Sequence, residues 1–303
     1  MNNSNLRDYY LKNGYIILKS VFSKEYISKI RNKIISSLLN SEKYTSRNSA
    51  KYISKFETTL DEDIQNILLN EKLIKSIKEI LATKSLLYYA DSNIVVRNNP
   101  NEVYDKYHHD ARGEDINISN EEEYPIIRLG VYFHDTKNFS GGLKIRKKSH
   151  KHIHFKFNFW DYLRKIKLLC LKKIYNFKSL RLGKGLNIEL EEGDIVIWNL
   201  RTHHAGMSRR LKLFPKLCLW PLFDKLIPNY FFLPFQYSNE RVALFCSFAK
   251  NDMNNKNILG YLKHKTSAEK INQIKSNSNL LNKLNSLECY MPKVELDNTE
   301  TFK

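Results

Sequence analysis

Cysteine is scarce in this chain of 303 residues, which contains only Cys170, Cys218, Cys246 and Cys289. Because no two of them form a Cys-x-x-Cys pair, the sequence indicates neither a disulfide framework nor a thiolate zinc site. The first 11 residues are polar with mixed charge, and they lack the basic start and apolar core of a signal peptide. These absences predict a protein of the cytoplasm.

Long hydrophobic runs and acidic residues are also in short supply. No stretch reaches the roughly 18 uninterrupted apolar residues of a membrane-spanning helix, so a transmembrane protein is not expected. The 32 Asp and Glu stand against 50 Lys and Arg, which gives a formal net charge of +18 at pH 7. Such an excess favours an anionic partner, namely a phospholipid surface, an acidic substrate or nucleic acid, unless it reflects only the Lys- and Asn-rich composition of the whole chain.

The hydrophobic pattern divides the chain into a helical N-terminal part and a strand-rich remainder. After Ser23, a typical N-cap residue, apolar side chains recur every three to four residues up to Leu38, which predicts a helix with one buried stripe. Helical patterns also cover 6–12 and 60–81, and a short strand is expected at 14–18. Strand-length runs separated by turn residues follow at 86–96, 126–134, 142–146, 186–189, 194–202 and 241–248. This order predicts an α+β fold, in which a jelly-roll barrel (the cupin-like double-stranded β-helix) is buttressed by N-terminal helices.

Two segments fit the barrel poorly and are interpreted as insertions, at about 151–185 and 211–237. In the first, apolar residues at helical spacing from Phe159 to Phe177 lie opposite lysines and arginines. Such a basic amphipathic helix can lie on an anionic membrane surface, although a covering helix with solvated lysines is the plainer interpretation. The second insertion is rich in aromatic residues and proline. The expected jelly-roll domain covers 1–264, and a polar, weakly helical tail follows at 265–303.

Two separated clusters contain candidate metal ligands: Tyr-His-His-Asp at 107–110 and Thr-His-His at 202–204. On a strand, His108 and Asp110 point to the same face, so both can reach one ion while His109 faces away. Two histidines and one carboxylate form the facial triad that holds iron(II) in non-haem oxygenases. Strict alternation along 194–204 would let only one of His203 and His204 face the metal, and spacing alone does not choose between them.

A series of segments extends these two clusters in a consistent order. They are Asn13–Ser23, Tyr107–Asp110, Arg128–Thr136, Gly141–Ile145, Lys148–Lys151, Glu192–Trp198 and Arg201–His204. The series resembles the phytanoyl-CoA dioxygenase-like family of iron(II)- and 2-oxoglutarate-dependent oxygenases. The resemblance implies iron(II), 2-oxoglutarate and dioxygen as cofactor and cosubstrates, and it implies His108, Asp110 and His204 as the metal ligands and catalytic residues.

The resemblance also implies an arginine that binds the far carboxylate of 2-oxoglutarate through a bidentate ion pair. Arg241 begins the strand-like run 241–248, as expected of that residue, although the second insertion separates it from His204. Arg210 is the alternative. Neither arginine is followed two residues later by serine, and in this the chain departs from the family's pattern. Tyr132 and Trp198 are expected to line the pocket.

The expected function is an iron(II)- and 2-oxoglutarate-dependent dioxygenase that hydroxylates a small-molecule or lipid-linked substrate, peripheral to an anionic membrane. Asp110 favours hydroxylation, because related halogenases replace this carboxylate with a small residue to admit halide. One alternative is a nucleic-acid-directed oxygenase, whose basic excess would contact phosphates. No recognised nucleic-acid-binding module is present, so this partner is not favoured. The other alternative is a catalytically silent jelly-roll binding module.

Overall fold

The computed structural model describes most of the helical layer and the barrel. The described residues are 6–39, 44–47, 50–53, 60–97, 108–111, 124–151, 185–217, 227–234, 241–252, 254–255, 258–261 and 274–292. Tyr107 and the basic helix expected within 151–185 lie outside them, and the second insertion is described only at 211–217 and 227–234.

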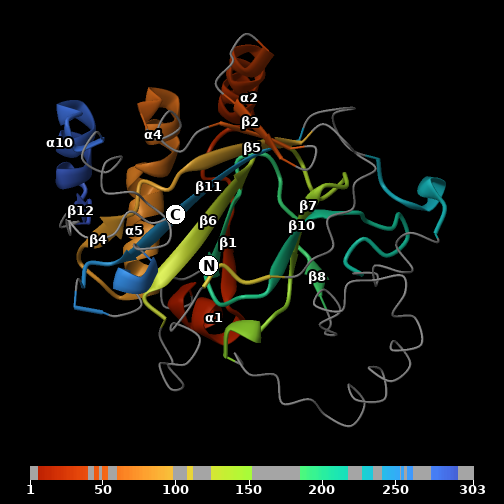
Figure 1. Cartoon of the computed structure of the whole chain (residues 1–303). Helices are drawn as coiled ribbons and strands as arrows, with labels where there is room; N and C mark the ends of the chain where they lie inside the picture. The colour runs from red at the N-terminus through yellow and green to blue at the C-terminus, as the bar shows by residue number, and fades with distance from the viewer. Residues whose placement is uncertain are drawn as a thin grey trace.

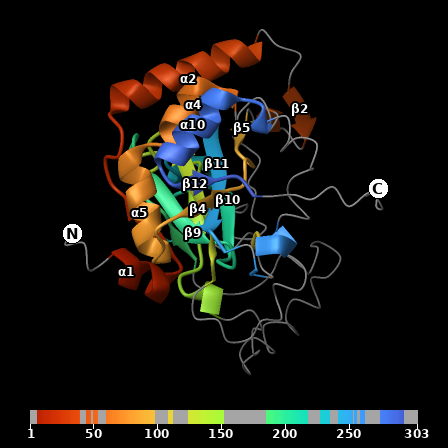
Figure 2. The ribbon, with the colours of Figure 1, turned by 90° about the vertical axis from the view of Figure 1, so that its left-hand side faces the viewer.

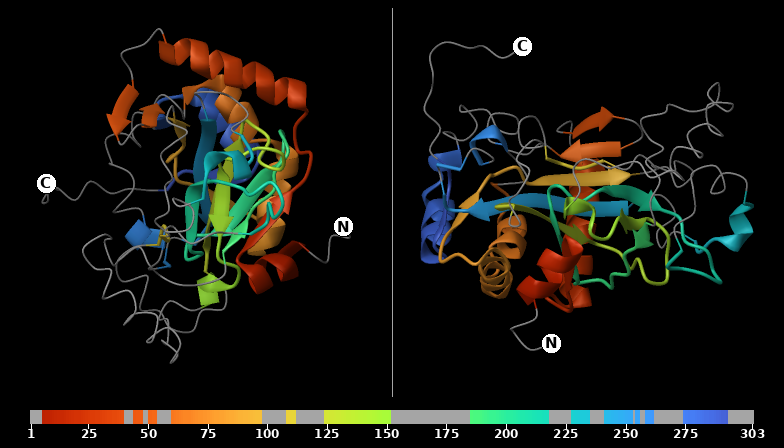
Figure 3. Two further views of the ribbon diagram at one scale, coloured as in Figure 1. Left: turned by 90° about the vertical axis from the view of Figure 1, so that its right-hand side faces the viewer. Right: turned by 90° about the horizontal axis from the view of Figure 1, so that it is seen from below.

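The α-helices among the described residues include α1 (Leu6–Asn13), α2 (Lys24–Leu39), α4 (Glu62–Leu68), α5 (Glu71–Leu81) and α10 (Ser278–Ser286). They share a core with the large sheet; Figure 2 shows α4, α5 and α10 in front of the strands, and the left view of Figure 3 shows the molecule from the opposite side. The helical pattern expected over 60–81 is two helices, because Asn70 begins a new one. Its side chain accepts a hydrogen bond from the backbone N–H of Leu73, as an N-cap does.

The large sheet is antiparallel throughout its main path and runs through the centre of the molecule (Figure 1). In order, its path is β1 (Tyr15–Leu18), β9 (Ile195–Asn199), β6 (Ile126–Tyr132), β11 (Arg241–Lys250), β5 (Asn93–Arg97), β3 (Ala50–Ile53) and β2 (Tyr44–Arg47). Off this path, β4 (Leu86–Tyr88) pairs with β11 and with β12 (Cys289–Tyr290). A second, smaller sheet has the order β10 (His204–Ser208), β7 (Gly142–Ile145) and β8 (Leu186–Asn187).

The central strands of the large sheet are buried on both faces, and the two faces differ in character. Leu129 of β6, Ile197 of β9 and Leu244 of β11 belong to the apolar core shared with the helices. The alternate residues, such as Tyr132 and Trp198, pack instead with side chains of the smaller sheet in a second cluster. Because side chains alternate along a strand, the two clusters occupy opposite faces. The mixed α+β chain thus has the jelly-roll fold, in which the smaller sheet packs on one face of the large sheet.

Several strand expectations require correction. The run 194–204 is not one strand, because β9 ends at Asn199 and a turn follows before β10 begins at His204. The turn is closed by the Asn199 side chain, whose oxygen accepts from the backbone N–H of Arg201, and by the Thr202 N–H, which donates to the Asn199 carbonyl. The run 86–96 is likewise divided into β4 and β5 around Asp91, and the β2–β3 hairpin was not anticipated from the sequence.

The described part of the tail contributes to the main core rather than lying apart from it. Leu280 and Leu284 of α10 are fully buried in the cluster that the helices share with the large sheet. Cys289 of β12 pairs in parallel with Leu86 of β4. The weakly helical segment expected here therefore completes the edge of the helical layer.

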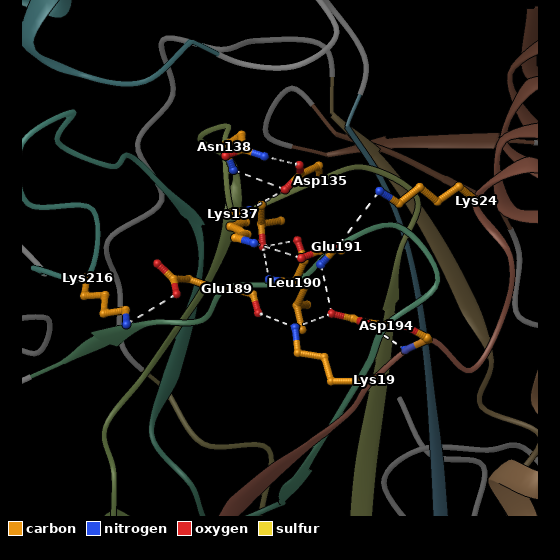
Figure 4. A network of polar contacts seen from close by, with 12 residues as sticks. Lys19, Lys24, Asp135, Lys137, Asn138, Glu189, Leu190, Glu191, Asp194 and Lys216 are labelled. Atoms are coloured by element: carbon orange, nitrogen blue, oxygen red, sulfur yellow. Dashed lines mark hydrogen bonds and ion pairs between the residues drawn. The ribbon is translucent and has the colours of Figure 1, made fainter.

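A polar network fastens the start of β9 to the N-terminal segment (Figure 4). The carboxylate of Asp194 accepts from Lys19 Nζ at 2.6 Å and from the backbone N–H of Ser20 at 2.9 Å. Gly193 has a φ of +93°, and a Cβ there would lie 2.1 Å from the carbonyl oxygen of Phe22, so glycine is required at this turn. Among the described residues, no helix combines the length and apolar character needed to cross a membrane.

Candidate metal centre

Backbone hydrogen bonds hold the His-x-Asp segment against the start of β10. His108 and His204 exchange both N–H to O bonds at 2.9 Å and form an isolated antiparallel bridge. The N–H of Asp110 then donates to the carbonyl of Leu200, in the turn that follows β9. His108 and Asp110 therefore do not sit on a regular strand, as the sequence had suggested, but on a short segment tied to the turn and to β10.

This arrangement brings together one atom each of His108, Asp110 and His204, all within 4.8 Å of one another. His204 Nε2 lies 3.6 Å from Asp110 Oδ2, and His108 Nε2 lies 4.0 Å from Asp110 Oδ1. The three side chains differ in their exposure to solvent: His204 is 7% exposed, Asp110 14% and His108 47%. The site is therefore open on the side of His108 and closed on the side of His204.

The two neighbouring histidines, His109 and His203, are not part of this group. Their rings stack on each other with centroids 5.6 Å apart and an angle of 15° between the planes. The sequence left open whether His203 or His204 faces the metal site. Within the structure it is His204 whose ring approaches His108, with centroids 4.4 Å apart.

The donor set fits a divalent transition metal. His204 Nδ1 lies 3.0 Å from the carbonyl oxygen of Thr202, which can only accept, so the proton is on Nδ1 and the Nε2 lone pair faces Asp110. Burial lowers the pKa of His204 to about 4, which keeps the ring neutral near pH 7, as a metal ligand must be. Two imidazoles and one carboxylate match the facial triad of non-haem iron(II) sites.

Aromatic side chains from the large sheet form the wall beside the triad. The ring of Trp198 lies 5.2 Å from that of His204 and stands edge-on to Phe245 at 6.1 Å. Gly130, between them on β6, lets both rings pack closely on the strand, because a Cβ there would lie only 3.1 Å from Trp198 and 3.2 Å from Phe245. Tyr132 is fully buried in the same cluster. The sequence named Trp198 and Tyr132 but not Phe245, whose inward direction follows from its alternation with Cys246 on β11.

The two candidate arginines have different surroundings. The guanidinium of Arg241 lies over the ring of Tyr132 at 5.3 Å, and its nitrogens lie 3.6 Å from where a Cβ of Gly206 would be, two residues beyond His204. Arg210 is fully buried, and it donates to Glu189 Oε1 at 2.6 Å, to the carbonyl of Pro215 at 3.1 Å and to the carbonyl of Thr136. Arg241 thus lies beside Gly206 on the strand that begins with His204, whereas Arg210 is held by Glu189 and by the carbonyls of Thr136 and Pro215.

A buried polar network behind the triad was missed by sequence reasoning. Arg128 on β6 directs Nε to within 3.5 Å of Asp110 Oδ2, and its Nη1 donates to Asp91 Oδ2 at 2.9 Å. Although burial opposes the charged form, the nearby carboxylates of Asp91 and Asp110 raise the pKa of Arg128 above its ordinary value. The available signal was a pair of charges, Asp91 and Arg128, inside otherwise apolar runs.

The comparisons with known proteins give structural neighbours only. No family model matches the chain, and no curated protein matches it significantly by sequence. Among solved structures, the epimerase SnoN from nogalamycin biosynthesis is 11% identical with a TM-score of 0.53, and 82% of each chain is covered. The carbocyclase SnoK from the same biosynthesis is 13% identical with a TM-score of 0.52, over 83% of this chain and 87% of that one. HygX from Streptomyces hygroscopicus is 12% identical with a TM-score of 0.51, over 82% and 87%.

SnoN and SnoK are described as non-haem, α-ketoglutarate-dependent enzymes, and HygX was solved with nickel and 2-oxoglutarate. At these identities the likeness concerns the fold. The chain therefore has the jelly-roll fold seen in non-haem, 2-oxoglutarate-dependent enzymes.

Proposed function

We propose that this chain is an iron(II)- and 2-oxoglutarate-dependent dioxygenase, of the phytanoyl-CoA dioxygenase-like branch, that hydroxylates a small or membrane-presented organic substrate. The observation that carries the proposal is that His108, Asp110 and His204 each bring one ligand atom to within 4.8 Å of the others, where the start of β10 meets the turn after β9. The shared fold of SnoN and HygX supports it, because both have been solved with a metal and α-ketoglutarate.

The proposed chemistry divides between the cofactor and the chain. Iron(II) in this site, with 2-oxoglutarate and dioxygen, supplies oxidation of a C–H bond, one oxygen atom entering the substrate as hydroxyl and the other entering succinate as carbon dioxide leaves. His108, Asp110 and His204 would hold the iron and would leave coordination positions for the cosubstrates. Asp110 keeps the carboxylate that a halide would have to replace, which favours hydroxylation.

The remaining residues of the proposed site bind 2-oxoglutarate or keep water away from the triad. Arg241 is proposed to hold the far carboxylate of 2-oxoglutarate, because a guanidinium offers two parallel N–H donors to it and stays charged at every relevant pH. Tyr132 packs under that guanidinium and keeps it directed toward Gly206. Trp198 and Phe245 cover the buried side of the triad, where exclusion of water protects the oxidising chemistry.

Turnover of 2-oxoglutarate in two paired variants tests the proposal. With iron(II) and oxygen, the wild-type chain is expected to convert 2-oxoglutarate to succinate slowly without substrate. His204→Ala should abolish this conversion, whereas His203→Ala should retain most of it, because His203 stacks on His109 outside the triad. Equal loss in both variants, or no succinate from the wild type under any condition, would argue against the assignment.

A cluster of exposed apolar side chains supports a membrane-presented substrate. This rim cluster consists of Leu213, Phe214, Leu217, Tyr230 and Phe231, which are between 43% and 80% exposed. The rim cluster begins nine residues after His204, and Figure 1 shows η5 (Asn229–Phe231), which carries two of its members, at the right-hand edge beyond the smaller sheet. Large apolar side chains held in water at one place mark a contact surface.

One part of the rim cluster is held in place by a buried arginine and bordered by lysines. Arg210 donates to the carbonyl of Pro215, within the 211–217 segment, and to Glu189. The Lys216 ammonium lies 3.7 Å from the same glutamate (Figure 4). Lys212 and the well-exposed Lys216 adjoin the apolar residues on the 211–217 segment. Apolar groups next to cationic ones suit the boundary between acyl chains and anionic headgroups.

Vesicle sedimentation tests this part of the proposal. The protein should sediment with vesicles that contain anionic phosphatidylserine, and less so as salt is raised or when the vesicles are neutral. Phe214→Ser should reduce binding, while Tyr290→Ser, at an exposed aromatic residue of β12, serves as the control and should not. Binding that is equal in both variants, or retention by oligonucleotides with none by vesicles, would remove the membrane element.

A further inference from the structure

A buried arginine stands directly behind the carboxylate of the candidate metal centre. Arg128 lies in the middle of β6, on the same face of the sheet as Tyr132, opposite Ser247 of β11 and Trp198 of β9. Its Nε is 3.5 Å from Asp110 Oδ2, the oxygen that is also 3.6 Å from His204 Nε2. One guanidinium edge therefore faces the triad.

The other edge of the guanidinium is fixed by neighbours from several elements. Nη1 donates to Asp91 Oδ2 and to Ser247 Oγ, both at 2.9 Å, and Nη2 donates to Asn93 Oδ1 at 3.0 Å. These contacts leave the side chain little rotational freedom. The planar fork of arginine can make all of them at once, whereas the single ammonium of lysine cannot.

The Asp91 carboxylate in turn accepts hydrogen bonds from three residues. It accepts from the Ser247 N–H at 2.8 Å, from Ser247 Oγ at 2.9 Å and from the Tyr261 hydroxyl at 2.9 Å, in addition to Arg128. The side chain is 1% exposed. A buried ion pair contributes little net stability compared with well-packed apolar side chains, so its presence in the sheet calls for a role in specificity or positioning.

We propose that Arg128 is a positioning residue that holds the Asp110 carboxylate in its metal-binding orientation, and that Asp91 fixes Arg128 for this task. The inference rests on the proposed metal site and extends it to residues beyond the three ligands. Groups that orient a metal ligand typically change metal affinity or activity by about 10- to 100-fold when they are removed.

Cobalt(II) binding under anaerobic conditions tests the inference, because the visible spectrum of this ion reports its ligand set. The wild-type chain should bind one cobalt(II). Arg128→Gln and Asp91→Asn should each weaken binding by about 10- to 100-fold and alter the spectrum. Arg128→Lys should also bind cobalt(II) more weakly than the wild type, because lysine keeps the positive charge but lacks the planar guanidinium. Asn93→Ala, which removes only one acceptor, should shift affinity in the same direction by less and is the variant of choice if Arg128→Gln fails to fold.

Glu189→Gln is the matched control, since it removes the charge that pairs with the other buried arginine, Arg210, away from the triad. It should lower stability and leave cobalt(II) affinity and spectrum unchanged. Simple charge repulsion predicts the opposite of our inference, namely tighter binding in Arg128→Gln. Unchanged or tighter binding in that variant and in Asp91→Asn would overturn the inference while the metal site stands, whereas a wild-type chain that binds no cobalt(II) would remove both proposals.

Discussion

Individual residues in this chain are placed by hydrogen bonds that sequence spacing does not reveal. His204 faces Asp110 because it begins β10 and because Thr202 fixes its Nδ1, whereas the alternation expected along 194–204 does not exist. The choice of His204 over His203 came from the family resemblance. The pairing of Arg128 with Asp91 needed the structure, because 37 residues separate them in sequence and no local pattern links them.

His134 gives a prediction at this scale. It is 3% exposed, and burial together with the nearby positive charge of Arg241 lowers its pKa to about 3. Between about pH 6.5 and 3, the unfolded chain binds a proton at this residue that the folded chain does not, so stability falls as the pH falls. His134→Gln should reduce that slope by up to about 1.4 kcal/mol per pH unit.

Urea unfolding at several pH values between 4.5 and 6.5, with EDTA present, measures the slope in wild type and variant. The buried His204 contributes a slope of its own, so only the difference between the two proteins is assigned to His134. Identical slopes in both would show that His134 is protonated, or exposed, in the folded chain.

Secondary-structure elements followed the sequence pattern where that pattern was strongly periodic. The helix after Ser23, the strands at 126–132 and 241–250 and the short strand at 15–18 lie close to their expected places. The division of 60–81 at Asn70 and of 86–96 at Asp91 was missed, because each interrupted run keeps its apolar periodicity across the break. β2 and β3 lack an apolar pattern, and they form strands because β2 pairs with β3 and β3 pairs with β5.

The anchored segment 211–217 gives a prediction at the scale of elements. Arg210→Met should release the Pro215 carbonyl and leave Glu189 without its buried partner, at a cost of roughly 3 kcal/mol, reduced because Glu189 is partly exposed. The affinity for 2-oxoglutarate should stay near the wild-type value, because Arg241 is the arginine that we propose for its far carboxylate. Limited proteolysis should cleave the variant faster within 211–217.

Arg209→Met, one residue earlier, is the control for that variant. The Arg209 guanidinium lies 3.6 Å above the ring of Phe232 and donates to Asn229 Oδ1 at 2.8 Å. Its loss leaves no buried charge without a partner, so it should lower stability less than Arg210→Met does. A large loss of 2-oxoglutarate affinity in Arg210→Met with little loss of stability would instead make Arg210 the cosubstrate arginine.

At the scale of the whole molecule, one apolar core joins β1 with α10. Ile16 near the N-terminus and Leu284 in the tail belong to the same cluster as the outer face of the large sheet. Leu284→Ala should therefore cost about 2–5 kcal/mol of unfolding free energy, in a single transition, because it opens a cavity in that shared core. Leu281→Ala, at the neighbouring partly buried position, should cost less.

The fold class was predictable from the order of helical and strand-like runs, because the jelly roll depends on that order more than on any residue. The contribution of the tail to the core was not, since Leu280 and Leu284 are too few to mark a buried helix in a polar sequence. A second, independent unfolding transition for the segment 274–292 would show that it is not part of this core.

The central claim, that His108, Asp110 and His204 form an iron(II) site that also binds 2-oxoglutarate, is tested most directly by anaerobic titration with iron(II) followed by 2-oxoglutarate. A visible charge-transfer band that saturates at one iron per chain is predicted for the wild type and for His203→Ala, and its absence is predicted for His204→Ala. No band in the wild type, or a band that survives in His204→Ala, would contradict the account.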